Sequence, residues 1–132
     1  MENEQSRALG AHRVRQEGEL VAIVLHGPLS LSEAQTFHGL VAEVLKQHGH
    51  AYVLADCQAG GALTAETRRW IAEWNRHHRV DGVALYGANL FVRTMISLVL
   101  NAISLLGSRA VPARFAKDEG EARAWLASLR TG

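Results

Sequence analysis

The chain has 132 residues, 48% of them hydrophobic and 20% charged, with 14 Lys and Arg residues against 13 Asp and Glu residues. This length and charge balance indicate one folded domain, and they exclude a disordered chain and a nucleic-acid binder that relies on a strongly basic surface. The single cysteine, Cys57, excludes an intrachain disulfide, and residues 1–10 lack the pattern of a secretory signal. We therefore expect a cytoplasmic protein.

The N-terminal part of the chain predicts a lead-in and a strand pair. Residues 1–10 are polar without a period and are expected to be flexible, so a single domain should occupy residues 11–132. In residues 12–16, polar side chains flank the apolar Val14 as in the alternating pattern of a strand, and residues 20–25 form a continuous apolar run. Such a run is typical of a strand that is buried on both faces of a sheet.

The next segment predicts a helix followed by a parallel strand. Ser30 and Glu33 have the spacing of a capping box, so a helix should begin there and run to about residue 47. Residues 51–55 form a second short apolar run, which predicts an interior strand. Residues 58–63, with two consecutive glycines, should form the loop that follows it.

The second half of the chain continues this alternation of helices and strands. Thr64 should cap a second helix, residues 80–86 should form a strand, and residues 89–106 a third helix. Residues 111–115 predict a short edge strand, and Asp118 opens a terminal helix. The fold class is therefore α/β, a single domain with a mainly parallel (mixed) sheet of about five strands and four helices.

Tryptophans on two of these helices are interpreted as packing residues. Trp70 and Trp74 share a face of the second helix with Ile71, which favours core packing over a stacking platform. The opposite face carries Arg68, Arg69, Glu73 and Arg76. On the terminal helix, Trp125 should be buried beside Leu126.

Residues 89–106 are more apolar than a helix on a sheet requires. At about 100° per residue, five polar residues beginning with Arg93 form one narrow stripe, and the remaining two thirds of the surface is hydrophobic. The segment is shorter than the ~20 residues that span a bilayer, so we do not expect a transmembrane helix. Something other than the core should cover part of it. The candidate interaction or ligand residues are Phe91, Arg93, Met95, Leu98, Val99 and Ala102.

Arg93 has two interpretations. It is either a solvated residue of the polar stripe, which we favour, or the charge that meets an anionic head group.

No catalytic, cofactor-binding or metal-binding residues are predicted. The seven histidines lack the i, i+4 spacing with which two helical residues bind one zinc. Cys57 follows a predicted interior strand, but it has no neighbouring base and is interpreted as a small buried hydrophobe. We therefore expect neither an enzyme nor a cofactor.

The order of elements and four short stretches resemble the STAS domain, in particular its anti-sigma-factor-antagonist-like branch, whose fold is shared with the CRAL-TRIO lipid carriers. The resemblance covers residues 20–129. Its stretches are YVLAD (52–56), GGALTAE (60–66), VALYG (83–87) and RFAKDEGEARAWL (114–126), of which the last is the most distinctive.

The resemblance implies a non-enzymatic, bacterial, cytoplasmic module that binds a protein partner or an apolar ligand. In the antagonist branch a phosphorylatable serine follows the strand that corresponds to residues 52–56. Here residues 58–65 contain no serine, and Thr64 is the one hydroxyl residue. Thr64 is interpreted as a helix cap in preference to a phosphosite.

Two functions of different classes are compatible with the apolar helix. In the first, the helix pairs with a second copy of the chain, giving a homodimeric interaction or regulatory module. In the second, the helix is one wall of a carrier or sensor for an apolar or lipid-like ligand. We favour the first.

Overall fold

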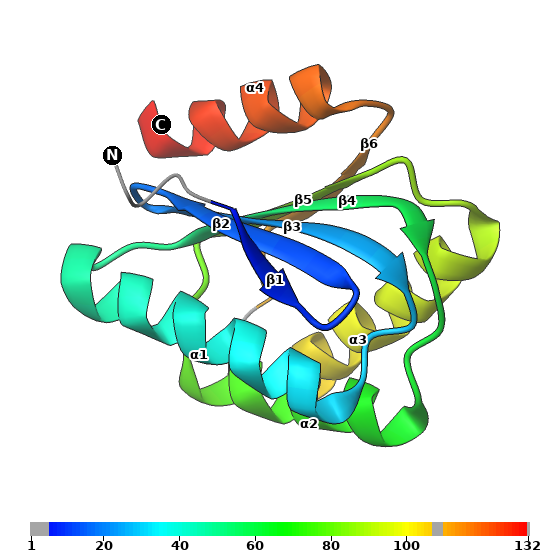
Figure 1. The fold of residues 1–132 in the computed structure, drawn as a ribbon. Coiled ribbons are helices and arrows are strands. Elements are labelled where there is room, and N and C mark those ends of the chain that lie inside the picture. Colours follow the sequence, from blue (N-terminus) through cyan, green and yellow to red (C-terminus); the bar gives the residue numbers. More distant parts are fainter. Residues whose placement is uncertain (1–5, 107–109, 132) are drawn as a thin grey trace.

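In the computed structural model, which describes residues 6–106 and 110–131, a six-stranded sheet carries four helices (Figure 1). The strands are β1 (Arg7–Leu9), β2 (His12–Glu17), β3 (Leu20–Gly27), β4 (Tyr52–Gly60), β5 (Gly82–Tyr86) and β6 (Ala113–Ala116). The helices are α1 (Leu31–His48), α2 (Ala65–His77), α3 (Leu90–Leu106) and α4 (Glu119–Thr131).

The strands lie in the sheet in their chain order, from β1 to β6. The first three pair antiparallel, and β3, β4, β5 and β6 pair parallel. The predicted α/β class with a mainly parallel, mixed sheet is therefore confirmed, as is the number of helices.

The predicted count of about five strands was one short. β1 pairs antiparallel with β2, where Arg7 lies opposite Val14 and Leu9 opposite His12. The expected flexible lead-in is therefore wrong for these three residues, while residues 1–5 lie outside the described residues. A three-residue strand has no periodicity of its own, and its pairing partner determines it.

The helices are divided unequally between the two faces of the sheet. α1, α2 and α3 cover one face, and α4 alone covers the other (Figure 1). β4 shows why its sequence is continuously apolar: Val53 and Ala55 belong to the core beneath the three helices, and Tyr52 and Leu54 to the core beneath α4. A strand that is covered on both faces needs apolar residues at every position.

The helix ends follow the expected capping chemistry. Ser30 and Glu33 form a capping box at the start of α1, and Gly49 ends that helix with φ +79°. At the start of α3, the Asn89 Oδ1 accepts a hydrogen bond from the Val92 N–H at 2.9 Å. Because these bonds fix where each helix begins, they also fix which side chains each helix turns toward the sheet.

One predicted loop is partly strand. β4 continues through Gly60, because His26 and Gly27 of β3 lie opposite Ala59 and Gly60. The loop expected over residues 58–63 therefore begins only at Gly61. Its backbone N–H donates to the carbonyl of Gly27 at 3.0 Å, which holds the loop close to the end of β3.

Candidate functional site

Helix α3 presents apolar side chains to solvent. Among the described residues, all the large hydrophobic side chains that are exposed belong to it: Leu90 (81%), Phe91 (53%), Leu98 (46%) and Leu105 (86%). Phe91, Leu98 and Leu105 recur every seven residues and so lie along one line of the helix. We call these three residues the α3 stripe. It is the exposed remainder of the wide apolar arc that the sequence predicts.

Another side of α3 packs into the molecule. Val92, Val99 and Ile103 are buried, and Met95 and Ala102 are partly buried between this side and the α3 stripe. Val99 lies about 100° around the helix from Leu98. Its assignment to an exposed interaction face is therefore wrong, whereas Phe91 and Leu98 do lie on that face.

Arg93 is exposed on a different side of α3 from the α3 stripe, about 140° around the helix from Leu98. Its guanidinium carbon lies 4.9 Å from the centre of the Phe115 ring of β6, in cation–π geometry. The charge therefore stays at the border between α3 and the sheet, in contact with water. This position agrees with the favoured interpretation of a solvated residue.

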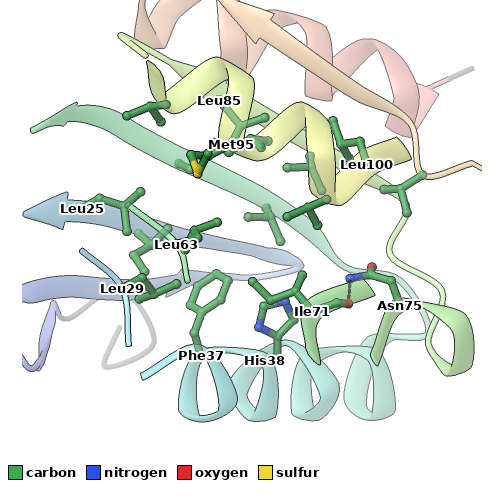
Figure 2. A pocket seen from close by; sticks show the side chains of 18 of the residues that line it. Leu25, Leu29, Phe37, His38, Leu63, Ile71, Asn75, Leu85, Met95 and Leu100 are labelled. Atoms are coloured by element: carbon green, nitrogen blue, oxygen red, sulfur yellow. Dashed lines mark hydrogen bonds between the residues drawn. The ribbon is translucent and has the colours of Figure 1, made fainter. Parts of the chain in front are cut away.

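A cavity of about 150 Å³ lies between the sheet and helices α1, α2 and α3. Figure 2 shows its surroundings, with Leu25 on a strand, Leu63 in the loop before α2, and Met95 and Leu100 on α3. Twenty-one of its 23 lining residues are apolar side chains or glycines, and the other two are His38 and Asn75. An apolar cavity of about this size can hold a six-carbon ring such as benzene. α3 thus faces solvent on one side and this cavity on the other.

The two polar lining residues carry no charge near neutral pH. The His38 Nδ1 lies 2.7 Å from the Ala34 carbonyl oxygen, to which it donates, so Nε2 holds the lone pair. Burial lowers the pKa of His38 to about 4, with a smaller lowering from the nearby His78. The Asn75 Nδ2 donates to the Ile71 carbonyl at 2.8 Å. The cavity therefore suits the apolar part of a ligand.

A cation lies at the edge of the cavity. The Arg68 Nη1 on α2 donates to the Leu63 carbonyl at 2.6 Å and contacts the Met95 sulfur at 3.4 Å, and both of these residues line the cavity. The side chain is partly buried, and none of the ion pairs among the described residues includes it.

Sequence reasoning missed Arg68 by placing it on the solvated face of the second helix. The available signal was its spacing. Arg68 precedes Ile71 by three residues and Asn75 by seven, and both of those residues line the cavity. Residues at these separations share one face of a helix.

Thr64 and Cys57 contribute to the fold: Thr64 caps a helix, and Cys57 is part of the core. The Thr64 hydroxyl accepts a hydrogen bond from the Thr67 N–H at 3.2 Å as the N-cap of α2. Cys57 is buried, and burial together with the Asp56 charge raises its pKa to about 12. A thiol in this state holds its proton at neutral pH and is a poor nucleophile.

Within residues 6–106 and 110–131, no three His, Cys, Asp or Glu side chains gather closely enough to hold a metal ion. No helix in the same ranges is long and apolar enough to cross a membrane.

Comparison with known proteins identifies relatives of this fold. The sequence profile of the SpoIIAA-like family matches residues 20–127. A crystal structure of an uncharacterized protein from Shewanella loihica, described as having a SpoIIAA-like fold, covers 88% of this chain and 92% of its own, with a TM-score of 0.59 and 15% sequence identity. No curated protein matches the sequence.

Proposed function

The chain belongs to the SpoIIAA-like family, and we propose that it is a non-enzymatic regulatory or interaction module that pairs with a second copy of itself through the α3 stripe. The observation that carries the proposal is the exposure of Phe91, Leu98 and Leu105 on one line of α3. Exposed apolar surface of this kind costs free energy in water unless another surface covers it.

A second copy of the chain is the simplest cover. Apolar residues at seven-residue spacing form the contact line of two helices packed side by side, and a two-fold axis lets one stripe cover its own equivalent. Arg93 is the single charged residue of α3, and it lies over Phe115. Two stripes can therefore meet without burying this charge, because Arg93 lies about 140° around the helix from Leu98. An anionic membrane surface would call for several Lys or Arg residues along the helix.

The chemistry of the buried groups supports a role without catalysis. Cys57 is a protonated, buried thiol, and His38 is neutral and hydrogen-bonded to its own helix. A nucleophile needs a base within hydrogen-bonding distance. Among the residues that the structure describes, the Cys57 sulfur bonds only to the carbonyl of Ala55, at 3.8 Å. The proposal places the module in a bacterial cytoplasm, where a single unpaired cysteine is usual.

The cavity favours a second candidate function, in which the protein carries or senses an apolar ligand. Its walls include Met95, Val99 and Ile103 of α3, so a ligand would lie directly behind the proposed pairing surface. A ligand in the cavity and a partner on the α3 stripe can coexist, because Val99 of the cavity wall and Leu98 of the stripe lie about 100° apart around the helix.

Native mass spectrometry of protein purified without detergent distinguishes the two functions. A mass of two chains without added mass supports pairing alone. A single chain with an added mass of lipid size supports the carrier and contradicts pairing. A single chain without added mass contradicts pairing and gives the carrier no support.

A further inference from the structure

We propose that the cavity binds a medium-chain carboxylate, with its alkyl chain among the apolar walls and its carboxylate on the guanidinium of Arg68. This inference rests on the second candidate function and gives it a ligand class. Its basis is the combination of an uncharged, apolar cavity with a partly buried arginine at its edge.

The guanidinium of Arg68 is held in place with donors to spare. Nη1 is occupied by the Leu63 carbonyl and the Met95 sulfur. Arginine has five N–H donors, and among the described residues the side-chain hydrogen bonds of Arg68 use Nη1, so the edge formed by Nε and Nη2 stays available. Two parallel N–H donors on one edge match the two oxygens of a carboxylate. Because Nη1 is already anchored, little side-chain freedom is lost when the carboxylate binds.

The charges around the site fit a ligand with one negative charge. The neighbouring charged residues of α2, Glu66 and Arg69, are exposed and lie about 200° and 100° around the helix from Arg68. Inside the cavity, His38 is neutral. A carboxylate would therefore remain at the edge with Arg68, since an unpaired charge among apolar walls is strongly disfavoured.

The dimensions set the length of the alkyl chain. The cavity of about 150 Å³ holds roughly the carbon content of benzene, about six atoms. Along α2, the distance from Arg68 at the edge to Asn75 on the cavity wall is about 10 Å at the usual helical rise. A carboxylate of roughly six to eight carbons fits both measures.

The test uses two probes and two matched variants of the full chain. Octanoate and 1-octanol share an eight-carbon skeleton, but only octanoate carries a negative charge. Arg68→Gln removes the cation at the cavity edge, and Arg69→Gln removes the exposed neighbouring cation as a control. Calorimetric titration measures the affinity of each probe for each protein. We expect Arg68→Gln to weaken octanoate binding about tenfold or more and to leave 1-octanol binding within about twofold. Arg69→Gln should change neither.

Each outcome separates this inference from the function on which it rests. If Arg68→Gln binds octanoate as tightly as the wild type, the Arg68 assignment is wrong and the carrier function stands. If the wild type binds neither probe, both are wrong. Binding of 1-octanol by Arg68→Gln reports that the variant is folded. If that variant does not fold, Arg68→Lys keeps the charge and loses the two-donor edge, and octanoate affinity equal to the wild type would overturn the inference.

Discussion

His38 on α1 meets the ring of Trp74 on α2 edge-on, with ring centroids 4.8 Å apart and an angle of 70° between the planes. Trp70 makes a similar edge contact with the same histidine, at 5.3 Å. Trp74 also stacks on His78, with centroids 3.9 Å apart. This aromatic cluster joins the two helices beside the cavity, and it places a titratable ring where a positive charge is poorly solvated.

The first prediction is that His38 makes stability depend on pH below neutrality. Its pKa is lowered from 6.5 to about 4 in the folded protein, mainly by burial. Between these two values the unfolded chain binds the proton more readily, so stability is greatest above pH 6.5 and falls as the pH drops toward 4. The expected loss is roughly 2 to 3 kcal/mol over this window.

Chemical denaturation at several pH values measures this dependence. His38→Phe retains an aromatic ring and removes the titration, so its stability should fall less steeply between pH 6.5 and 4. An equal slope for the variant and the wild type would show that His38 is not the group responsible.

The second prediction is that the Thr64 hydroxyl stabilises the start of α2. It accepts the Thr67 N–H bond and donates to the Thr67 hydroxyl at 3.0 Å. Thr64→Ala should cost about 1 kcal/mol in the free energy of unfolding, and Thr64→Ser, which keeps the hydroxyl, should recover most of it. Urea titration checks both variants. Equal stability of the Ala and Ser variants would contradict the capping role.

The third prediction is that Cys57 is unreactive in the folded protein. Burial raises its pKa to about 12, so the thiolate is scarce at pH 8. A thiol-specific chromogenic reagent should label the native protein far more slowly than the protein in urea. Rapid labelling of the native protein would place Cys57 at an accessible site and reopen the question of a nucleophile.

The fourth prediction concerns Trp125. The sequence suggested a buried side chain, but the structure leaves it partly buried at the margin of the core beneath α4, whereas Leu126 is fully inside. Trp125→Ala should therefore destabilise the protein by about 2 kcal/mol, below the roughly 3 to 5 kcal/mol of a large aromatic residue in a core. Leu126→Ala serves as the buried comparison, at roughly 2 to 5 kcal/mol. A Trp125 loss of under about 1 kcal/mol would place the ring on the surface.

Much of the fold could be predicted because local chemistry determines it. The caps Ser30 and Asn89 mark helix starts in the sequence itself, and the apolar run of β4 identifies a strand covered on both faces. β1 could not be predicted in this way. Its three residues carry no pattern, and they form a strand because β2 is available beside them.

The site could be predicted only in part for a related reason. A helical wheel gives the angle between Leu98 and Val99 but not the direction of the sheet, so Val99 was placed on the exposed side although it is buried. The sequence pattern of α2 groups Arg68 with the solvated residues, because the contacts that hold its side chain, Leu63 and Met95, come from other elements. The cavity depends on the space left between three helices, which no local pattern records.

The fifth prediction is that two copies of the chain pair through the α3 stripe. Leu98→Glu places a charge in the middle of that stripe, and Ser104→Glu places the same charge on an exposed position of α3 about 120° away. A buried, unpaired carboxylate would be strongly unfavourable in the paired state, whereas a carboxylate away from the contact has little effect.

Sedimentation velocity of the wild type and these two variants at tens of micromolar tests this pairing, with circular dichroism to show that each is folded. We expect a dimer for the wild type and for Ser104→Glu, and a folded monomer for Leu98→Glu. A wild-type monomer, or a Leu98→Glu variant that remains a folded dimer, would contradict it.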